Sequence, residues 1–96
     1  MYARTVTAAL VPGKADEAIR IYREQVLPLV QAQGGSHRVT LLIDRANNQA
    51  MAITEWESSE NLEATGQGTA YLQEAMAKLR GVVVPKSVEH WEVAIG

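Results

Sequence analysis

Hydrophobic and polar residues follow two different periods along the chain, and these periods predict strands and helices in turn. Residues 3–11 are β-branched and apolar with alternation, and a Pro-Gly pair ends them, which is typical of a strand. Over residues 15–30 apolar side chains recur every three or four positions, which predicts an amphipathic helix. Because Pro28 lacks an amide hydrogen and clashes one turn back, we expect a kink or a break near it.

The second half of the chain predicts a hairpin, two helices and a last strand. Residues 36–43 and 49–57 flank the turn-rich sequence DRANN, as expected of a β-hairpin. Ser58 or Ser59 can cap a short helix that runs through Ala64. After the loop TGQG, Thr69 opens a second long helix, and Gly81 ends it; the predicted last strand covers residues 87–95.

This order, β-α-β-β-α-β, predicts one domain over residues 1–96 with a ferredoxin-like α+β sandwich fold. Its four-stranded antiparallel sheet would carry both helices on one face. The hairpin, however, is apolar on both sides: Leu41 and Ile43 alternate with Leu42, and Ala52 alternates with Ile53. Two helices cover only one face of a sheet, so the other face predicts a partner, and a second copy of the same sheet is the simplest one.

Composition narrows the classes of function. The chain has 96 residues, a net charge of −2 and no cysteine, which excludes a thiol nucleophile and Cys-based metal sites and fits the cytoplasm. Its nine Lys and Arg residues are scattered among acids, so we expect no nucleic-acid partner. There is no signal-peptide pattern and no apolar run near the roughly 20 residues that cross a bilayer, so no membrane association is expected.

Several stretches resemble the antibiotic biosynthesis monooxygenase family of dimeric α+β barrels. These stretches are ITEWESSENLEA followed by YLQEAMAKL, together with VPGKADEAIRIY and VEHWEV. The resemblance implies a homodimer whose sheets pack face to face, with a small pocket in each subunit between sheet and helices. The family includes cofactor-free monooxygenases that oxidise phenols to quinones, relatives that degrade haem, and members with no established activity.

The chain departs from the active patterns of that family at three places. The aromatic-oxidising enzymes have Asn four residues before the Trp, where this chain has Ala52. The haem degraders have Asn in the first strand, where this chain has the segment 5–7, and a ligand His where this chain has TGQG. We therefore expect no haem and no other cofactor. Quinone formation remains a candidate activity, because an electron-rich substrate can react with oxygen itself once it is bound and deprotonated.

Three aromatic side chains are candidates for contact with a ligand. Trp56 shares a strand side with Thr54 and two alanines, and the resemblance turns that side toward the helices. Its ring either walls a pocket there or fills the space that the small residues leave. Tyr22 and Tyr71 lie on the apolar sides of their helices, where each phenol either orients a substrate or belongs to the core with its hydroxyl at the rim. Trp56, Thr54, Tyr22 and Tyr71 are the predicted substrate-binding residues.

Two charged or titratable side chains are candidates for catalysis alongside Trp56. Arg4 lies in an apolar strand, where its charge needs either an ion-pair partner or an anion such as a phenolate. His90 and Glu92 point the same way from one strand. His90 would be the best general base in a pocket because its pKa lies near neutrality, although an edge-strand or interface role is the alternative. No third metal ligand is evident beside them, so no metal site is predicted.

Two functions remain open from the sequence. One is a cofactor-independent monooxygenase that acts on a small aromatic or quinol-type molecule. The other is a non-catalytic homodimer of the same fold that binds a small hydrophobic ligand, as in the related stress-responsive barrels. The missing Asn and His favour the second function, and the position of Trp56 is compatible with both.

Overall fold

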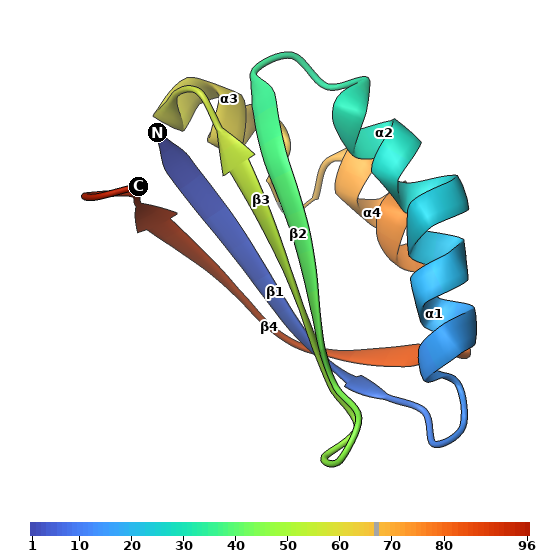
Figure 1. Cartoon of the computed structure of the whole chain (residues 1–96). Helices are drawn as coiled ribbons and strands as arrows, with labels where there is room; N and C mark the ends of the chain where they lie inside the picture. The colour runs from blue at the N-terminus through green and yellow to red at the C-terminus, as the bar shows by residue number, and fades with distance from the viewer. Residues whose placement is uncertain (67) are drawn as a thin grey trace.

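The computed structural model describes residues 1–66 and 68–96, so Gln67 of the predicted loop lies outside the described residues. Four antiparallel strands form one sheet in the order β2-β3-β1-β4. The helices lie against one face of this sheet, and none of the described helices covers the opposite face (Figure 1). The predicted ferredoxin-like α+β fold with its β-α-β-β-α-β order is confirmed. The strands are β1 (Tyr2–Leu10), β2 (Ser36–Asp44), β3 (Gln49–Trp56) and β4 (Val83–Glu92).

The first helical region is continuous but changes type within it. It consists of α1 (Ala15–Ile21), the π-helical segment η1 (Tyr22–Val26) and α2 (Leu27–Gln31). The backbone N–H of Leu27 donates to the carbonyl of Tyr22, five residues earlier, as in a π-helix. The widened turn comes just before Pro28, whose ring would clash with a carbonyl one α-turn back. The irregularity expected near Pro28 therefore takes the form of a π-helical turn.

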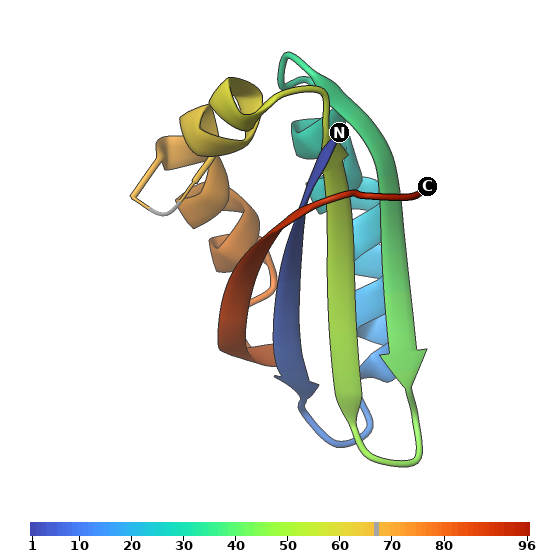
Figure 2. The same ribbon diagram turned by 90° about the vertical axis from the view of Figure 1, so that its left-hand side faces the viewer.

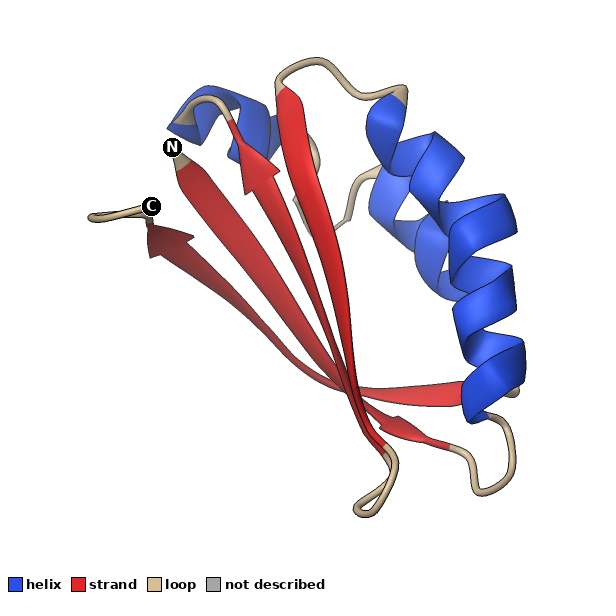
Figure 3. Ribbon diagram, viewed as in Figure 1, coloured by secondary structure: helices blue, strands red, loops and turns tan. Residues whose placement is uncertain are grey.

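The predicted hairpin and helix caps are also confirmed. The hairpin turn contains Asn48 with a φ of 52°, a left-handed conformation that asparagine tolerates well. Ser58 caps α3 (Ser59–Ala64), since its hydroxyl accepts from the backbone N–H of Asn61 at 3.1 Å. Thr69 caps α4 (Ala70–Lys78) in the same way. Figure 3 shows the helices and strands of the whole chain by colour.

The prediction for the last strand was wrong at both ends. β4 starts at Val83, four residues earlier than expected, and ends at Glu92. It lies at the edge of the sheet, where Pro85 is tolerated because its missing N–H would not be needed by another strand. The pairing of β4 with β1 shifts between Thr7 and Ala8. This irregularity accommodates the proline-containing part of the strand.

Strand register shows which residues share a face of the sheet. Directly paired residues point to the same side, so Leu41, Ala52, Val6 and Val88 form one cross-strand row toward the helices. The next row, Thr40, Ile53, Thr5 and Glu89, points to the uncovered face, which Figure 2 views with α1 and α2 behind the strands. Within the described residues, no helix is long and apolar enough to span a membrane.

The uncovered face is apolar across the hairpin and more polar across β1. Leu42 and Met51 pair with each other, and Leu42 is 49% exposed. Thr5 and Thr7 then interrupt the apolar surface before Trp91, whose indole N–H donates to the Thr5 hydroxyl at 2.9 Å. The predicted apolar patch is present but is less continuous than the sequence indicates.

Candidate ligand-binding site

Three predicted site residues meet in one cross-strand row on the helix side of the sheet. Thr54 of β3 pairs with Arg4 of β1, which in turn pairs with His90 of β4. Residues paired in this way point to the same face, so three separate strands deliver these side chains to one place. α3 and α4 lie over this end of the sheet (Figure 1).

Arg4 is the centre of this cluster. Its side chain is only 2% exposed. Its Nε donates to Nε2 of His90 at 3.2 Å, its Nη1 donates to the hydroxyl of Thr65 at 3.2 Å, and its Nη2 donates to the carbonyl of Leu62 at 2.6 Å. All three acceptors are uncharged, and among the described residues no carboxylate lies within 4.0 Å of its nitrogens.

The ion-pair partner considered for Arg4 is therefore not found in the described part of the chain. Leu62 and Thr65 lie at the C-terminal end of α3, where backbone carbonyls lack helical partners and carry partial negative charge. This end of the helix takes the place of a carboxylate. Burial lowers the pKa of Arg4, because it removes water from the charged form.

Trp56 packs behind Arg4 and is fully buried, at 0% exposure. The guanidinium carbon of Arg4 lies 5.8 Å from the centre of the indole, within the range of a cation–π contact. The ring of Tyr71 meets the indole edge-on, with 6.2 Å between ring centres and an interplanar angle of 85°. The indole N–H of Trp56 has no hydrogen-bond partner among the described residues, an unusual state for a buried donor.

Two small hollows separate the sheet from the helices next to this cluster. The first, of about 50 Å³, is lined at its polar end by Arg4, Thr54, Tyr22 and Tyr71. The second, of about 40 Å³, continues along the sheet past Ala50 toward Ala18 of α1. Both hollows are lined by Val6, Tyr22, Ala52, Met76 and Leu79.

The structure thus places the predicted residues in two groups around the first hollow. Arg4, Thr54, Tyr22 and Tyr71 line the first hollow, whereas Trp56 and His90 contact Arg4 from outside its lining. Sequence reasoning missed Met76 and Leu79. Met76 lies on α4 and Leu79 follows at its C-terminal end. Their apolar character and helical spacing indicate core packing and give no signal for a cavity.

Burial keeps the tyrosines of the site uncharged. Burial raises the pKa of Tyr22 to about 12, and a smaller contribution comes from Tyr71. Burial also raises the pKa of Tyr71, while the nearby positive charge of Arg4 acts in the opposite direction. At neutral pH both phenols are therefore hydrogen-bond donors, and Arg4 supplies the positive charge of the first hollow.

His90 is placed to orient Arg4. Its Nε2 accepts from Arg4, so this nitrogen carries no proton and its lone pair is already engaged. Burial and the charge of Arg4 lower the pKa of His90, while Glu63 acts in the opposite direction. The ring is exposed on the edge strand, which matches the edge-strand alternative considered for it. Among residues 1–66 and 68–96, no three His, Asp or Glu side chains are close enough together to hold a metal ion.

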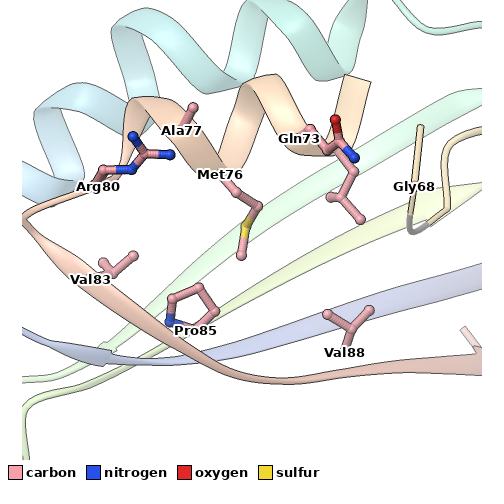
Figure 4. Close-up of a pocket in the computed structure, with 9 residues that line it drawn as sticks. Gly68, Gln73, Met76, Ala77, Arg80, Val83, Pro85 and Val88 are labelled. Carbon is pink, nitrogen blue, oxygen red and sulfur yellow. The ribbon is translucent and has the colours of Figure 1, made fainter. Parts of the chain in front are cut away.

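A larger open groove runs between α4 and β4, with a volume of about 690 Å³ (Figure 4). Its walls are mainly apolar, from Leu72 and Met76 on the helix and from Val83, Pro85 and Val88 on the strand. The sequence placed no strand at residues 83–86, so this groove could not be predicted from it.

Comparison with curated proteins finds relatives without an assigned activity, and no protein-family model matches the chain. Two uncharacterized proteins of Mycobacterium tuberculosis are each 30% identical to it. The first match covers 98% of this chain and 41% of that protein, and the second covers 99% and 39%. The chain therefore spans less than half the length of the curated relatives it matches.

Solved structures show the same fold. A provisionally assigned antibiotic biosynthesis monooxygenase from Bordetella bronchiseptica matches with a TM-score of 0.79 and 20% identity, over 98% of this chain and 97% of that one. SnoaB, a cofactor-independent oxygenase from Streptomyces nogalater, matches with a TM-score of 0.74 and 19% identity, over 99% and 95%. The structural neighbours are thus antibiotic biosynthesis monooxygenase proteins, and the α+β fold that the sequence resemblance implies for the single chain is confirmed.

Proposed function

We propose that this chain binds a small phenol or quinol as its phenolate, between the sheet and the helices, and promotes its oxidation by O2 without a cofactor. The observation that carries this proposal is Arg4. It is a buried cation beside a hollow, and its partners in the described chain are all neutral. The carbonyl end of α3 offsets part of the cost of burying this charge, and an anionic oxygen in the first hollow would offset more of it.

The residues of the first hollow suit a phenolate chemically. Arg4 stabilises the anionic oxygen and so lowers the pKa of the bound phenol. Tyr71 and Thr54 offer neutral hydroxyl donors in the same lining. The apolar remainder of the cavity excludes water around the ring, which strengthens the attraction between Arg4 and the anion.

The reaction needs no group beyond the substrate and oxygen. The phenolate transfers one electron to O2, and the resulting superoxide bonds to the ring carbon opposite the oxygen. In a phenol that carbon bears a hydrogen, which moves as a proton to the outer oxygen; the C–H electron pair forms the new C=O bond, and the O–O bond breaks to release hydroxide. Phenolate and O2 thus become quinone and hydroxide, with both electron pairs supplied by the substrate. In a quinol that carbon bears a hydroxyl instead, and the substrate passes two electrons and two protons to O2, which gives quinone and hydrogen peroxide. The protein orients the ring and favours the anion, because only the anion is electron-rich enough to react.

A second candidate function, binding without turnover, is favoured by Ala52. This residue lines both hollows, at the position where the resemblance places Asn in the aromatic-oxidising enzymes. Its methyl group offers no hydrogen bond to a reacting oxygen. In this case Arg4 would hold an anionic ligand that is released unchanged.

Oxygen consumption and binding, measured together, test both candidates. With a panel of one- and two-ring phenols and quinols, the wild-type protein is expected to bind the phenolate and take up one O2 per molecule. Arg4→Met is expected to weaken phenolate binding by about 2 kcal/mol, the scale of a charged hydrogen bond, and to leave binding of the neutral methyl ether unchanged. Arg4→Lys keeps the charge and should retain part of the affinity, and Arg38→Met removes an exposed arginine as a control.

The oxygenase and the binding protein predict different results in these measurements. Binding without oxygen uptake across the panel supports the second candidate and contradicts the oxygenase. A folded Arg4→Met protein that binds phenolates as tightly as the wild type contradicts both, because neither then depends on the buried cation.

We further propose that a second copy of the chain covers the open face of the sheet. Leu42, Met51 and Ile53 form an apolar surface there, and Trp91 presents its ring with its N–H already bonded to Thr5. Such a surface on both partners is self-complementary across a two-fold axis. The resemblance implies the same arrangement, with the two sheets packed face to face.

A further inference from the structure

The two hollows are too small for the ligand proposed above unless something moves. They measure about 40 and 50 Å³. A single benzene ring occupies engineered cavities of about 150 Å³. The open groove between α4 and β4, by contrast, measures about 690 Å³. The side chains that separate the two hollows from the groove therefore decide whether such a ligand can enter.

The dividing wall consists of three side chains. Leu72 lines both the groove and the first hollow, and Val83 lines both the groove and the second hollow. Met76 lines all three spaces. Figure 4 shows its side chain extending from α4 toward Pro85 of β4, across the gap between helix and strand.

Met76 is also the member of this wall that moves most easily. Its side chain is unbranched and flexible, so it adopts alternative rotamers at low cost, whereas Val83 is β-branched and stiff at χ1. The residue is only partly buried, because one side of it faces the groove. A change of rotamer toward the groove would join the two hollows to each other and to the groove.

We propose that Met76 is the gate of the ligand site and that ligands enter through the groove between α4 and β4. This inference rests on the proposed function only in placing the ligand in the hollows. The open gate gives a pocket that is closed and polar at the Arg4 end and open and apolar at the other. A ligand with a second ring would hold its phenolate ring beside Arg4 and extend its other ring into the groove, against Pro85 and Val88.

Benzene tests the gate independently of the proposed chemistry, because it needs an apolar space and no contact with Arg4. Its entry can be followed by NMR, through the methyl signals of Val6 and Leu41, which line the hollows. Met76→Ala is expected to speed entry about tenfold, equivalent to removing a barrier of one side-chain rearrangement. Met76→Phe is expected to slow it. Glu74→Ala changes an exposed position of the same helix that lines none of the three spaces, so it serves as the control and should have no effect.

A second experiment compares the binding of phenol with the binding of 1-naphthol. Met76→Ala is expected to strengthen the binding of 1-naphthol more than that of phenol, because only the two-ring molecule must occupy the gate position. Entry of benzene at the same rate in the wild type, Met76→Ala and Met76→Phe overturns the gate, as does failure of benzene to enter Met76→Ala. Gated entry of benzene without binding of either phenolate leaves the gate intact and contradicts the proposed function instead.

Discussion

The two faces of the sheet are built from alternate residues of the same strands, yet they differ in almost every property. On β1, Arg4 and Val6 face the helices, and Thr5 and Thr7 face outward. The covered side combines a buried cation, two neutral phenols and unfilled space. The uncovered side combines threonines with large apolar side chains. We therefore propose chemistry that needs exclusion of water for the covered face and association for the uncovered face.

The two tryptophans show the difference most clearly. Trp56 is fully buried, and its N–H lacks a partner in the described chain, so the fold tolerates a polar defect there. Trp91 is 52% exposed, and its N–H is bonded to Thr5. The buried ring is thus held by packing and by contacts of its π-system with Arg4 and Tyr71, and the exposed ring is held by a hydrogen bond. Substituting each side chain measures what its face contributes.

The largest expected effect is on the covered face. Trp56→Ala should lower the free energy of unfolding by about 3–5 kcal/mol, because it removes a large buried ring and leaves a cavity under Arg4. Trp91→Ala should cost less in the isolated subunit, where half of its ring is already in water. Denaturant unfolding at low protein concentration measures both. Equal losses of unfolding free energy in Trp56→Ala and Trp91→Ala would contradict the difference between the covered and the uncovered face.

The next effect belongs to the open face. Ile53→Lys places a charge at the centre of the proposed dimer interface and should weaken association by about 2–5 kcal/mol. Analytical ultracentrifugation over a concentration series measures the shift from dimer to monomer. Gln25→Lys adds the same charge to an exposed position of the helix and should leave association unchanged. A wild-type protein that is a stable monomer at micromolar concentration would refute the dimer.

A third test uses the alkaline pH range. Because the folded pKa of Tyr22 is raised to about 12, its contribution to stability is fully present below pH 10 and is lost as the pH rises toward 12. The loss amounts to about 3 kcal/mol for a shift of two pKa units. Tyr22→Phe should remove this component of the pH dependence. Denaturation midpoints from pH 9 to 12 compare the two proteins, and parallel curves would show that Tyr22 is not buried.

The smallest effect concerns His90. Its folded pKa is lowered, so its contribution to stability is present above its ordinary value near 6.5 and is lost as the pH falls through the lower folded value. Protonation removes the acceptor of Arg4 and places two cations together, with Glu63 as the nearby opposing charge. The fluorescence of Trp56, in a Trp91→Phe background, should change over this range. His90→Gln retains an acceptor that does not titrate and should abolish the change.

The sequence predicts the architecture well because that architecture depends on local patterns. The caps at Ser58 and Thr69 and the hairpin turn follow from side chains a few residues apart. It predicts less about the site, because the site depends on partners distant in the chain. Arg4 could be recognised as a charge in need of a partner, but Leu62 and Thr65 could not be identified as that partner without the position of α3. The early start of β4 was missed because proline argues against a strand unless the strand is known to lie at an edge.

The π-helical turn explains an otherwise odd spacing in the first helical region. Ala18, Tyr22, Val26 and Val30 are all buried and recur every four residues, whereas an ideal α-helix turns once in 3.6. Three such steps would carry a regular α-helix about 120° out of phase with the sheet, and the wider turn takes up part of that drift. The π-turn therefore accommodates one more residue than an α-turn, and this keeps the buried side chains on the side of the helix that faces the sheet. Deleting Gln25 should restore a regular helix and still leave Val30 facing the core, because the residue removed is the one that the wider turn accommodates.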